Sequence, residues 1–139
     1  MATATSGRKP NYFFLAFGAP DAKKPPVEHG IYPHWKGFVS SSGIVAGDVM
    51  LLYCCDGYPE HAMEAPGVGV VTGTETGGEE EIIYYQYFPL CHPVGWSTIT
   101  ASIPELKGNT NFSLAGNWLR AISSSSFRAA IAGRQIDWP

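Results

Sequence analysis

The chain has 139 residues, a formal net charge of −3, 45% hydrophobic residues and 13% aromatic residues. This composition fits one globular domain with a hydrophobic core and excludes an intrinsically disordered chain. The negative charge argues against a protein that holds long nucleic acid mainly by electrostatics, because such binding needs many Lys and Arg contacts to phosphate. A reader of one extruded base stays open, since stacking and a few hydrogen bonds can carry its selectivity.

The predicted elements follow apolar runs separated by Gly and Pro. Residues 1–10 are predicted to be a flexible tail and residues 11–139 a single domain. The run at 49–55 is apolar at nearly every position, as in a strand buried on both faces. A helix is predicted to begin among the serines at 123–126 and to stop at Gly133. Strands are predicted at 11–17, 49–55, 67–74, 81–88 and 119–122, an extended or turning segment at 30–35, and helices at 97–106 and 123–132.

Glycine and proline refine the prediction for the sheet. Gly67 and Gly69 inside a strand permit the bulge or sharp coil that closing a small barrel requires. Pro89 and Pro93 are predicted to break the strand at 81–88. Short strands with helices in the long connections indicate an α+β fold, a small β-barrel with short helices in its connections.

The cysteines and the N-terminus indicate the compartment. Cys54, Cys55 and Cys91 lack C-x-x-C spacing, so we expect reduced thiols and no metal or redox site. Neighbours on a strand, Cys54 and Cys55 should point to opposite faces. No apolar run reaches the length of a membrane span, and the N-terminus lacks the apolar segment of a signal peptide. We therefore expect a cytoplasmic protein without a membrane partner.

Trp35 is the strongest candidate for ligand contact. It precedes a small-residue run and lies near Tyr32 in a segment rich in Gly and Pro. A base stacked on a half-exposed indole gains about 1–3 kcal/mol. The alternative is a tryptophan that covers the end of the barrel core.

Polar residues after Trp35 can read the edge of a base. Ser40, Ser41 and Ser42 offer hydroxyl and backbone N–H groups, or they cap a helix. Asp56 follows the strongest strand, beside Tyr53, and can accept a hydrogen bond from an exocyclic amine; the alternative is an Asp-Gly turn.

The C-terminal half adds further candidates. Asn117 can pair with an adenine-like edge. Trp96 and Trp118 lie in the same irregular half of the chain, and Trp118 also fits a core position. The four histidines and Cys91 show no metal-ligand spacing, and no cysteine opens a helix. We therefore expect neither a metal, nor a cofactor, nor a catalytic thiol.

The order of these motifs resembles the EVE/YTH domains of the PUA-like superfamily. The likeness covers residues 11–74, where it rests on an aromatic strand, a tryptophan, a small polar run, a G-D-x-Φ-Φ-Φ-Y strand (Φ apolar) and a G-Φ-G-Φ-Φ strand. It implies a PUA-like barrel that holds one modified base, with Trp35 as a wall of the pocket. The second tryptophan of the YTH pattern has no counterpart at 74–80. The likeness therefore implies another wall residue: Tyr32, Tyr58, Trp96 or Trp118.

The resulting hypothesis is a non-catalytic module that reads a methylated or hydroxymethylated base, flipped from DNA or RNA into an aromatic pocket. Its expected partners are the modified nucleic acid and a fused or associated nuclease or NTPase domain, as in a modification-dependent restriction system. The alternatives are a PUA-like module that binds structured RNA by shape, an enzyme that uses Cys and His on a small molecule, and a protein-interaction domain with an apolar surface patch.

Overall fold

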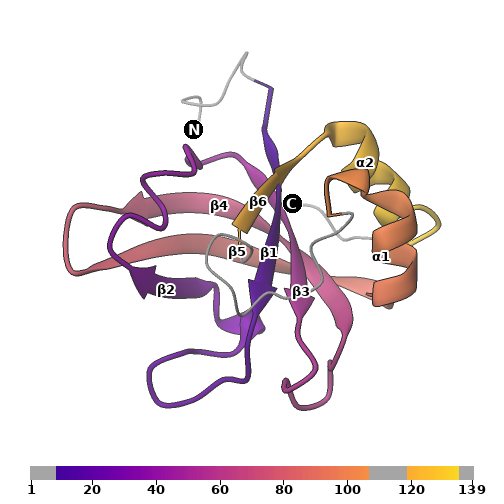
Figure 1. Cartoon of the computed structure of the whole chain (residues 1–139), viewed down its shortest axis with the longest axis horizontal. Coiled ribbons are helices and arrows are strands. Elements are labelled where there is room, and N and C mark those ends of the chain that lie inside the picture. The colour runs from indigo at the N-terminus through magenta and orange to yellow at the C-terminus, as the bar shows by residue number, and fades with distance from the viewer. Residues whose placement is uncertain (1–8, 107–118, 135–139) are drawn as a thin grey trace.

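The computed structural model describes residues 9–106 and 119–134, which form one six-stranded sheet with short helices on one side (Figure 1). The strand order is β2-β5-β4-β3-β1-β6. The prediction of a small α+β domain is therefore confirmed. The elements are β1 (Tyr12–Phe17), η2 (Val27–His29), β2 (Ile31–Trp35), β3 (Val49–Cys54), β4 (Glu64–Glu75), β5 (Glu80–Gly95), α1 (Trp96–Ser102), η3 (Pro104–Leu106), β6 (Leu119–Ile122) and α2 (Ser124–Ala130).

The neighbouring strands β1 and β3 run parallel, and every other pairing in the described sheet is antiparallel. Their register places Phe14 beside Leu51 and Leu15 beside Leu52. All six residues of β3 are buried, as the unbroken apolar run predicts. Because side chains alternate along a strand, β1 and β3 each supply residues to both faces of the sheet.

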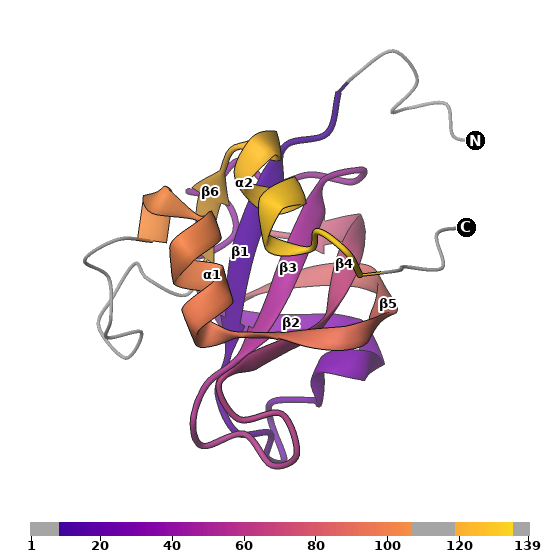
Figure 2. The same cartoon turned by 90° about the vertical axis from the view of Figure 1, so that its right-hand side faces the viewer.

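Two hydrophobic cores result, one on each face. The helix-side core contains Phe14, Leu51 and Tyr53 with Ile99 of α1 and Phe127 of α2. Figure 2 shows both helices in front of β1 and β3, with β2 behind the sheet. The concave core lies on the other face, inside the curl of the sheet, and is completed by loop residues. Its members include Phe13, Leu15, Phe17, Val27, Tyr32, Val39, Met50, Leu52, Ile83 and Tyr85.

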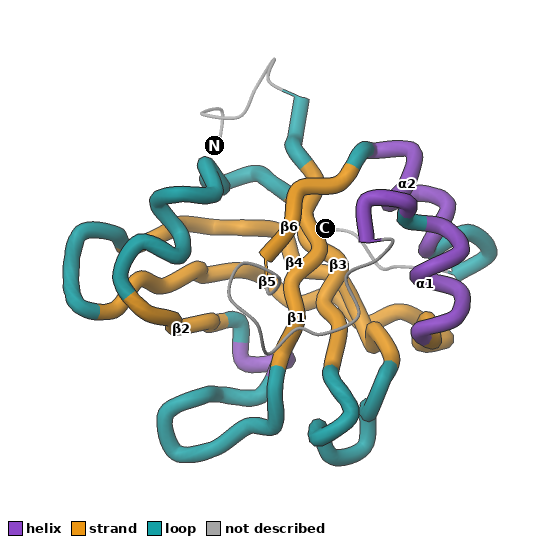
Figure 3. Tube along the Cα trace, viewed as in Figure 1, coloured by secondary structure: helices purple, strands orange, loops and turns teal. Residues whose placement is uncertain are grey.

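The sheet curls into a half-barrel (Figure 3). Side chains bridge its open side. β2 is the first strand in the order and β1 the fifth, yet Tyr32 Oη donates to the Ala16 carbonyl at 2.9 Å. The rings of Phe17 and Tyr32 pack edge to face, with centroids 4.8 Å apart. We call this junction between Ala16–Phe17 and Tyr32 the seam.

The predicted end of a strand at Pro89 is wrong, because β5 continues to Gly95. Gly67 pairs with Pro89 and Ala65 with Val94, so β4 advances two residues where β5 advances five. Pro93 lies in this bulge and Pro89 at its start, which is where a strand tolerates proline.

Gly67 and Gly69 have a packing role in β4. A Cβ at Gly69 would lie 2.8 Å from the Tyr85 ring, and one at Gly67 would lie 2.7 Å from the Tyr87 ring. Both glycines therefore let the large tyrosines of β5 lie across β4.

The remaining local predictions are confirmed for β1, β6 and both helices. Ser123 caps α2, since its hydroxyl accepts a hydrogen bond from the Ser126 N–H at 3.1 Å. Cys54 belongs to the concave core and Cys55 packs against the helix-side core, so the adjacent cysteines do point to opposite faces. Across 9–106 and 119–134, every helix is too short or too polar to cross a bilayer.

Candidate functional site

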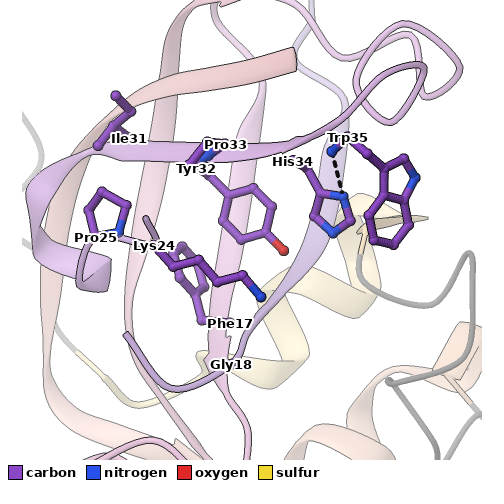
Figure 4. Close-up of a pocket in the computed structure, with 9 residues that line it drawn as sticks. All are labelled: Phe17, Gly18, Lys24, Pro25, Ile31, Tyr32, Pro33, His34 and Trp35. Carbon is purple, nitrogen blue, oxygen red and sulfur yellow. Dashed lines mark hydrogen bonds between the residues drawn. The ribbon is translucent and has the colours of Figure 1, made fainter. Parts of the chain in front are cut away.

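A cavity of about 180 Å³ opens at the seam (Figure 4). The end of β1, the loop after it and the edge strand β2 supply its walls. β1 and β2 are not paired with each other, so side chains line the space between them. We call it the seam cavity. Its lining residues are Phe17, Gly18, Lys24, Pro25, Ile31, Tyr32, Pro33, His34 and Trp35.

β2 is an edge strand whose composition discourages further pairing. In an antiparallel pair, every second residue of a strand turns its backbone N–H and C=O toward the partner strand. Gly30 is such a residue, since its carbonyl accepts from Tyr85 N of β5 at 2.9 Å. The backbones of Pro33 and Trp35 consequently face away from β5. Proline has no N–H to offer there, and the Trp35 N–H is bonded to His34 Nδ1 at 3.0 Å. The backbone of this edge is therefore poorly suited to pair with another strand, whereas the side chains of β2 can still line a ligand site.

Trp35 has 57% of its surface exposed, so the indole does not cover the barrel core. Its ring packs edge-on against His34, with centroids 3.7 Å apart, and against Phe38 at 6.2 Å. These contacts support the indole on one side, and much of its remaining surface is available for a ligand.

His34 is the centre of the aromatic group beside Trp35. It stacks on Phe38 with centroids 3.8 Å apart and planes 10° apart, and on Tyr32 at 5.8 Å. Burial, assisted by the charge of Lys24, lowers the pKa of His34 to about 4. The imidazole is therefore neutral at physiological pH. Because Nδ1 accepts the Trp35 N–H, its proton lies on Nε2, which becomes a hydrogen-bond donor.

Glu81 fixes the segment that carries Phe38. Its Oε1 accepts from Val39 N at 2.9 Å and from Ser40 N at 2.8 Å. Its Oε2 accepts from Ser40 Oγ at 3.2 Å and Gly77 N at 3.1 Å. The carboxylate is only 1% exposed, and these hydrogen bonds, with Ser40 N–H first, lower the pKa of Glu81 to about 2.

The hydroxyls of the predicted reading serines already have partners: Glu81 for Ser40, and carbonyls of the same turn for Ser41 and Ser42. Ser40 binds Glu81, while Ser42 Oγ donates to Val39 O at 2.6 Å and accepts from Ile44 N at 3.1 Å. Ser41 Oγ approaches Phe38 O at 3.4 Å. None of the three lines the seam cavity. They shape the turn that follows Trp35.

The structure separates the other predicted residues from Trp35. Tyr53 and Trp96 pack together at 5.1 Å on the helix side of the sheet. Tyr58 is buried, and its hydroxyl accepts from Val27 N at 2.9 Å. Asp56 is exposed in the turn after β3. Asn117 and Trp118 lie outside the described residues. Of the predicted wall residues that the structure describes, Tyr32 alone lines the seam cavity with Trp35.

Sequence reasoning did not place Lys24, Phe38 or Glu81 at the site. A signal existed for His34, which lies two residues after Tyr32 in an extended segment and so shares its face. Glu81 follows two other glutamates, and nothing in the sequence distinguishes the buried one. Lys24 reaches the site from an irregular loop, whose path the sequence does not reveal.

Neither metal nor thiol chemistry gains support from the described residues. Those residues contain no cluster of three or more His, Cys, Asp or Glu side chains suited to a metal ion. Burial is the main cause that raises the pKa of Cys54 to about 12 and that of Cys55 to about 11, so both thiols are protonated at neutral pH. The chain matches no protein-family model and no curated protein. Function must therefore be argued from the geometry of the site.

Proposed function

We propose that this chain is a non-catalytic reader of a modified base. The base, methylated or hydroxymethylated, is extruded from DNA or RNA and stacks on Trp35 at the mouth of the seam cavity. As part of the same proposal we assign the half-barrel to the PUA-like superfamily. The observation that carries the proposal is the 57% exposed indole beside an aromatic cavity.

Stacking supplies the affinity in this proposal. Every base has a π-face, and stacking on an aromatic side chain contributes about 1–3 kcal/mol per base. His34 and Phe38 hold the indole in place before the ligand arrives, which lowers the entropic cost of binding. The volume of about 180 Å³ is well below that of sites for drug-sized ligands, so one small ring with a substituent suits it better than a large cofactor.

Selectivity would come from the groups around the cavity. The His34 Nε2–H and the Lys24 ammonium can donate to a carbonyl or ring nitrogen, and Phe17 with Pro25 offers an apolar surface for a methyl group. A base whose edge left these donors unpaired would bind more weakly. The serines after Trp35 are less suited to this role because their hydroxyls are already bonded, to Glu81 or to carbonyls within the turn.

An aromatic group of this kind also suits a methylated ammonium, which binds aromatic faces through cation–π attraction. Lys24 argues against that ligand, since its ammonium lines the same cavity and would repel a second cation. A neutral heterocycle meets no such repulsion. The base reader is therefore favoured over a reader of methylated lysine.

The test is a titration of the full chain with labelled oligonucleotides. Single and double strands would carry methyladenine, methylcytosine, hydroxymethylcytosine or only plain bases. We expect one modified base to bind best, and Trp35→Ala to weaken that binding roughly 5- to 150-fold, which corresponds to a loss of 1–3 kcal/mol. Val45→Ala, which also removes an exposed apolar side chain, should leave affinity unchanged. Equal affinity across the panel, or full binding by Trp35→Ala, would overturn the proposal.

A further inference from the structure

A second hollow, of about 460 Å³, adjoins the seam cavity and shares four lining residues with it: Lys24, Pro33, His34 and Trp35. Its other lining residues are Lys23, Glu79 and Glu80. We call it the charged hollow. Because Trp35 borders both spaces, a group attached to a ligand on the indole can reach the charged hollow.

A tight turn holds the two lysines at this hollow. Asp21 Oδ1 accepts from Lys23 N at 2.8 Å and from Lys24 N at 2.9 Å. The backbone of Asp21 also exchanges two bonds with Lys24, at 3.0 and 3.2 Å. Neither lysine forms an ion pair with any residue that the structure describes. The turn thus fixes the backbone from which both lysines reach one wall of the hollow.

The other wall of the charged hollow is acidic. Glu79 and Glu80 are exposed at the start of β5, and Glu80 lies opposite Trp35 in the register of β2 and β5. A simple anion would gain from the lysines but would be repelled by the glutamates. A ligand that carries an anion beside a hydrogen-bond donor, such as the 2′-hydroxyl of an RNA nucleotide, matches both walls.

We propose that the charged hollow binds the phosphodiester attached to the extruded base, with Lys23 and Lys24 against its phosphate oxygens. The ligand is then a nucleotide within a strand and not a free base or nucleoside. This inference rests on the proposed function, because the stacked base brings the phosphate to the hollow. Lysine suits the role, since its ammonium acts as a mobile point charge toward phosphate.

The experiment measures how affinity depends on salt, with the best oligonucleotide of the panel and the full chain. Each phosphate contact contributes about 0.7–0.9 to the slope of log K against log salt. Lys23→Gln and Lys24→Gln should each lower the slope by about that amount and weaken binding at low salt. Arg128→Gln removes an exposed positive charge from α2 and serves as the matched control, with an unchanged slope. Glu79→Gln should tighten binding at low salt.

The two proposals fail in different ways. If Trp35→Ala loses binding while both lysine variants keep the parent slope, the phosphate site is overturned and the base reader stands. The phosphate site is overturned in the same way if Arg128→Gln lowers the slope as much as the lysine variants do. If Trp35→Ala binds as tightly as the parent, both proposals fall, because stacking of a base on Trp35 then does not anchor the strand. Binding of free nucleoside as tight as that of the oligonucleotide would also overturn the phosphate site.

Discussion

The two faces of the sheet are completed in different ways. On the helix side, α1, α2 and η3 cover the sheet and close a core around Phe14 and Leu51. On the concave side, loops and the curl of the sheet itself enclose Leu15 and Met50. The same strands, β1 and β3, feed both cores through alternate residues. Regular elements close the first face, whereas the second depends on side chains that meet across the seam.

This difference explains where the candidate site lies. A sheet that pairs fully around a barrel leaves no free edge, but here β1 and β2 stop short of pairing. Tyr32 crosses the gap, and the space beside it becomes the seam cavity. Aromatic residues on β2 cover the gap between β1 and β2, where the two backbones do not pair. The exposed indole of Trp35 is therefore a consequence of incomplete closure and not an isolated surface residue.

The largest expected effect tests the difference between the two cores directly. Phe14→Ala removes a fully buried ring from the helix-side core and should lower the free energy of unfolding by about 3–5 kcal/mol. Phe17→Ala should cost less, because that ring already borders a cavity, and should weaken oligonucleotide binding. Urea denaturation measures both losses. Equal losses of stability, with binding unchanged in Phe17→Ala, would show that the concave side is packed as completely as the helix side.

A second prediction concerns the loop beside Trp35. Glu81→Gln should destabilise the protein at neutral pH, because Gln keeps one acceptor oxygen where the carboxylate accepts from four donors. The pKa of Glu81 is lowered from 4.5 to about 2, so its contribution is complete above pH 4.5. That contribution declines as the pH falls toward 2. The stability difference between parent and variant should shrink over the same range.

Denaturation at several pH values measures this difference. Glu79→Gln, two residues earlier and exposed, is the matched control for stability and should change the free energy of unfolding little. A Glu81→Gln penalty that stays constant from pH 7 to pH 2.5 would mean that the charge on the carboxylate does not hold the turn. Binding offers a second readout, since looser Phe38 and His34 rings should weaken stacking on Trp35.

Sequence reasoning succeeded where the determinants are local. The apolar run of β3, the aromatic run of β1 and the serine cap of α2 each depend on neighbouring residues. It failed at the end of β5, because the strand passes Pro89 by bulging against β4. Whether a proline ends a strand depends on its partner, and the partner lies some twenty residues away in the chain.

The same distinction between local and distant contacts explains why only part of the candidate site was predicted. The exposure of Trp35 follows from its local setting, and Tyr32 shares its short segment. Tyr53 was grouped with them, yet the pairing of β1 with β3 assigns it to the face of Phe14. Glu81 binds Val39 across a separation of 42 residues, and no local pattern reveals such a contact.

The smallest expected effect tests the seam itself. Tyr32→Phe keeps the ring but removes the hydroxyl that donates to Ala16 O, which should cost about 1 kcal/mol. Tyr84→Phe is the matched control, since its hydroxyl bonds to Glu75 at the surface and its loss should cost less. Hydrogen exchange should quicken in β2 of Tyr32→Phe, because within the described sheet β2 pairs with β5 alone. If both variants behave alike in exchange and in stability, ring packing between Phe17 and Tyr32 closes the half-barrel, and the hydrogen bond does not.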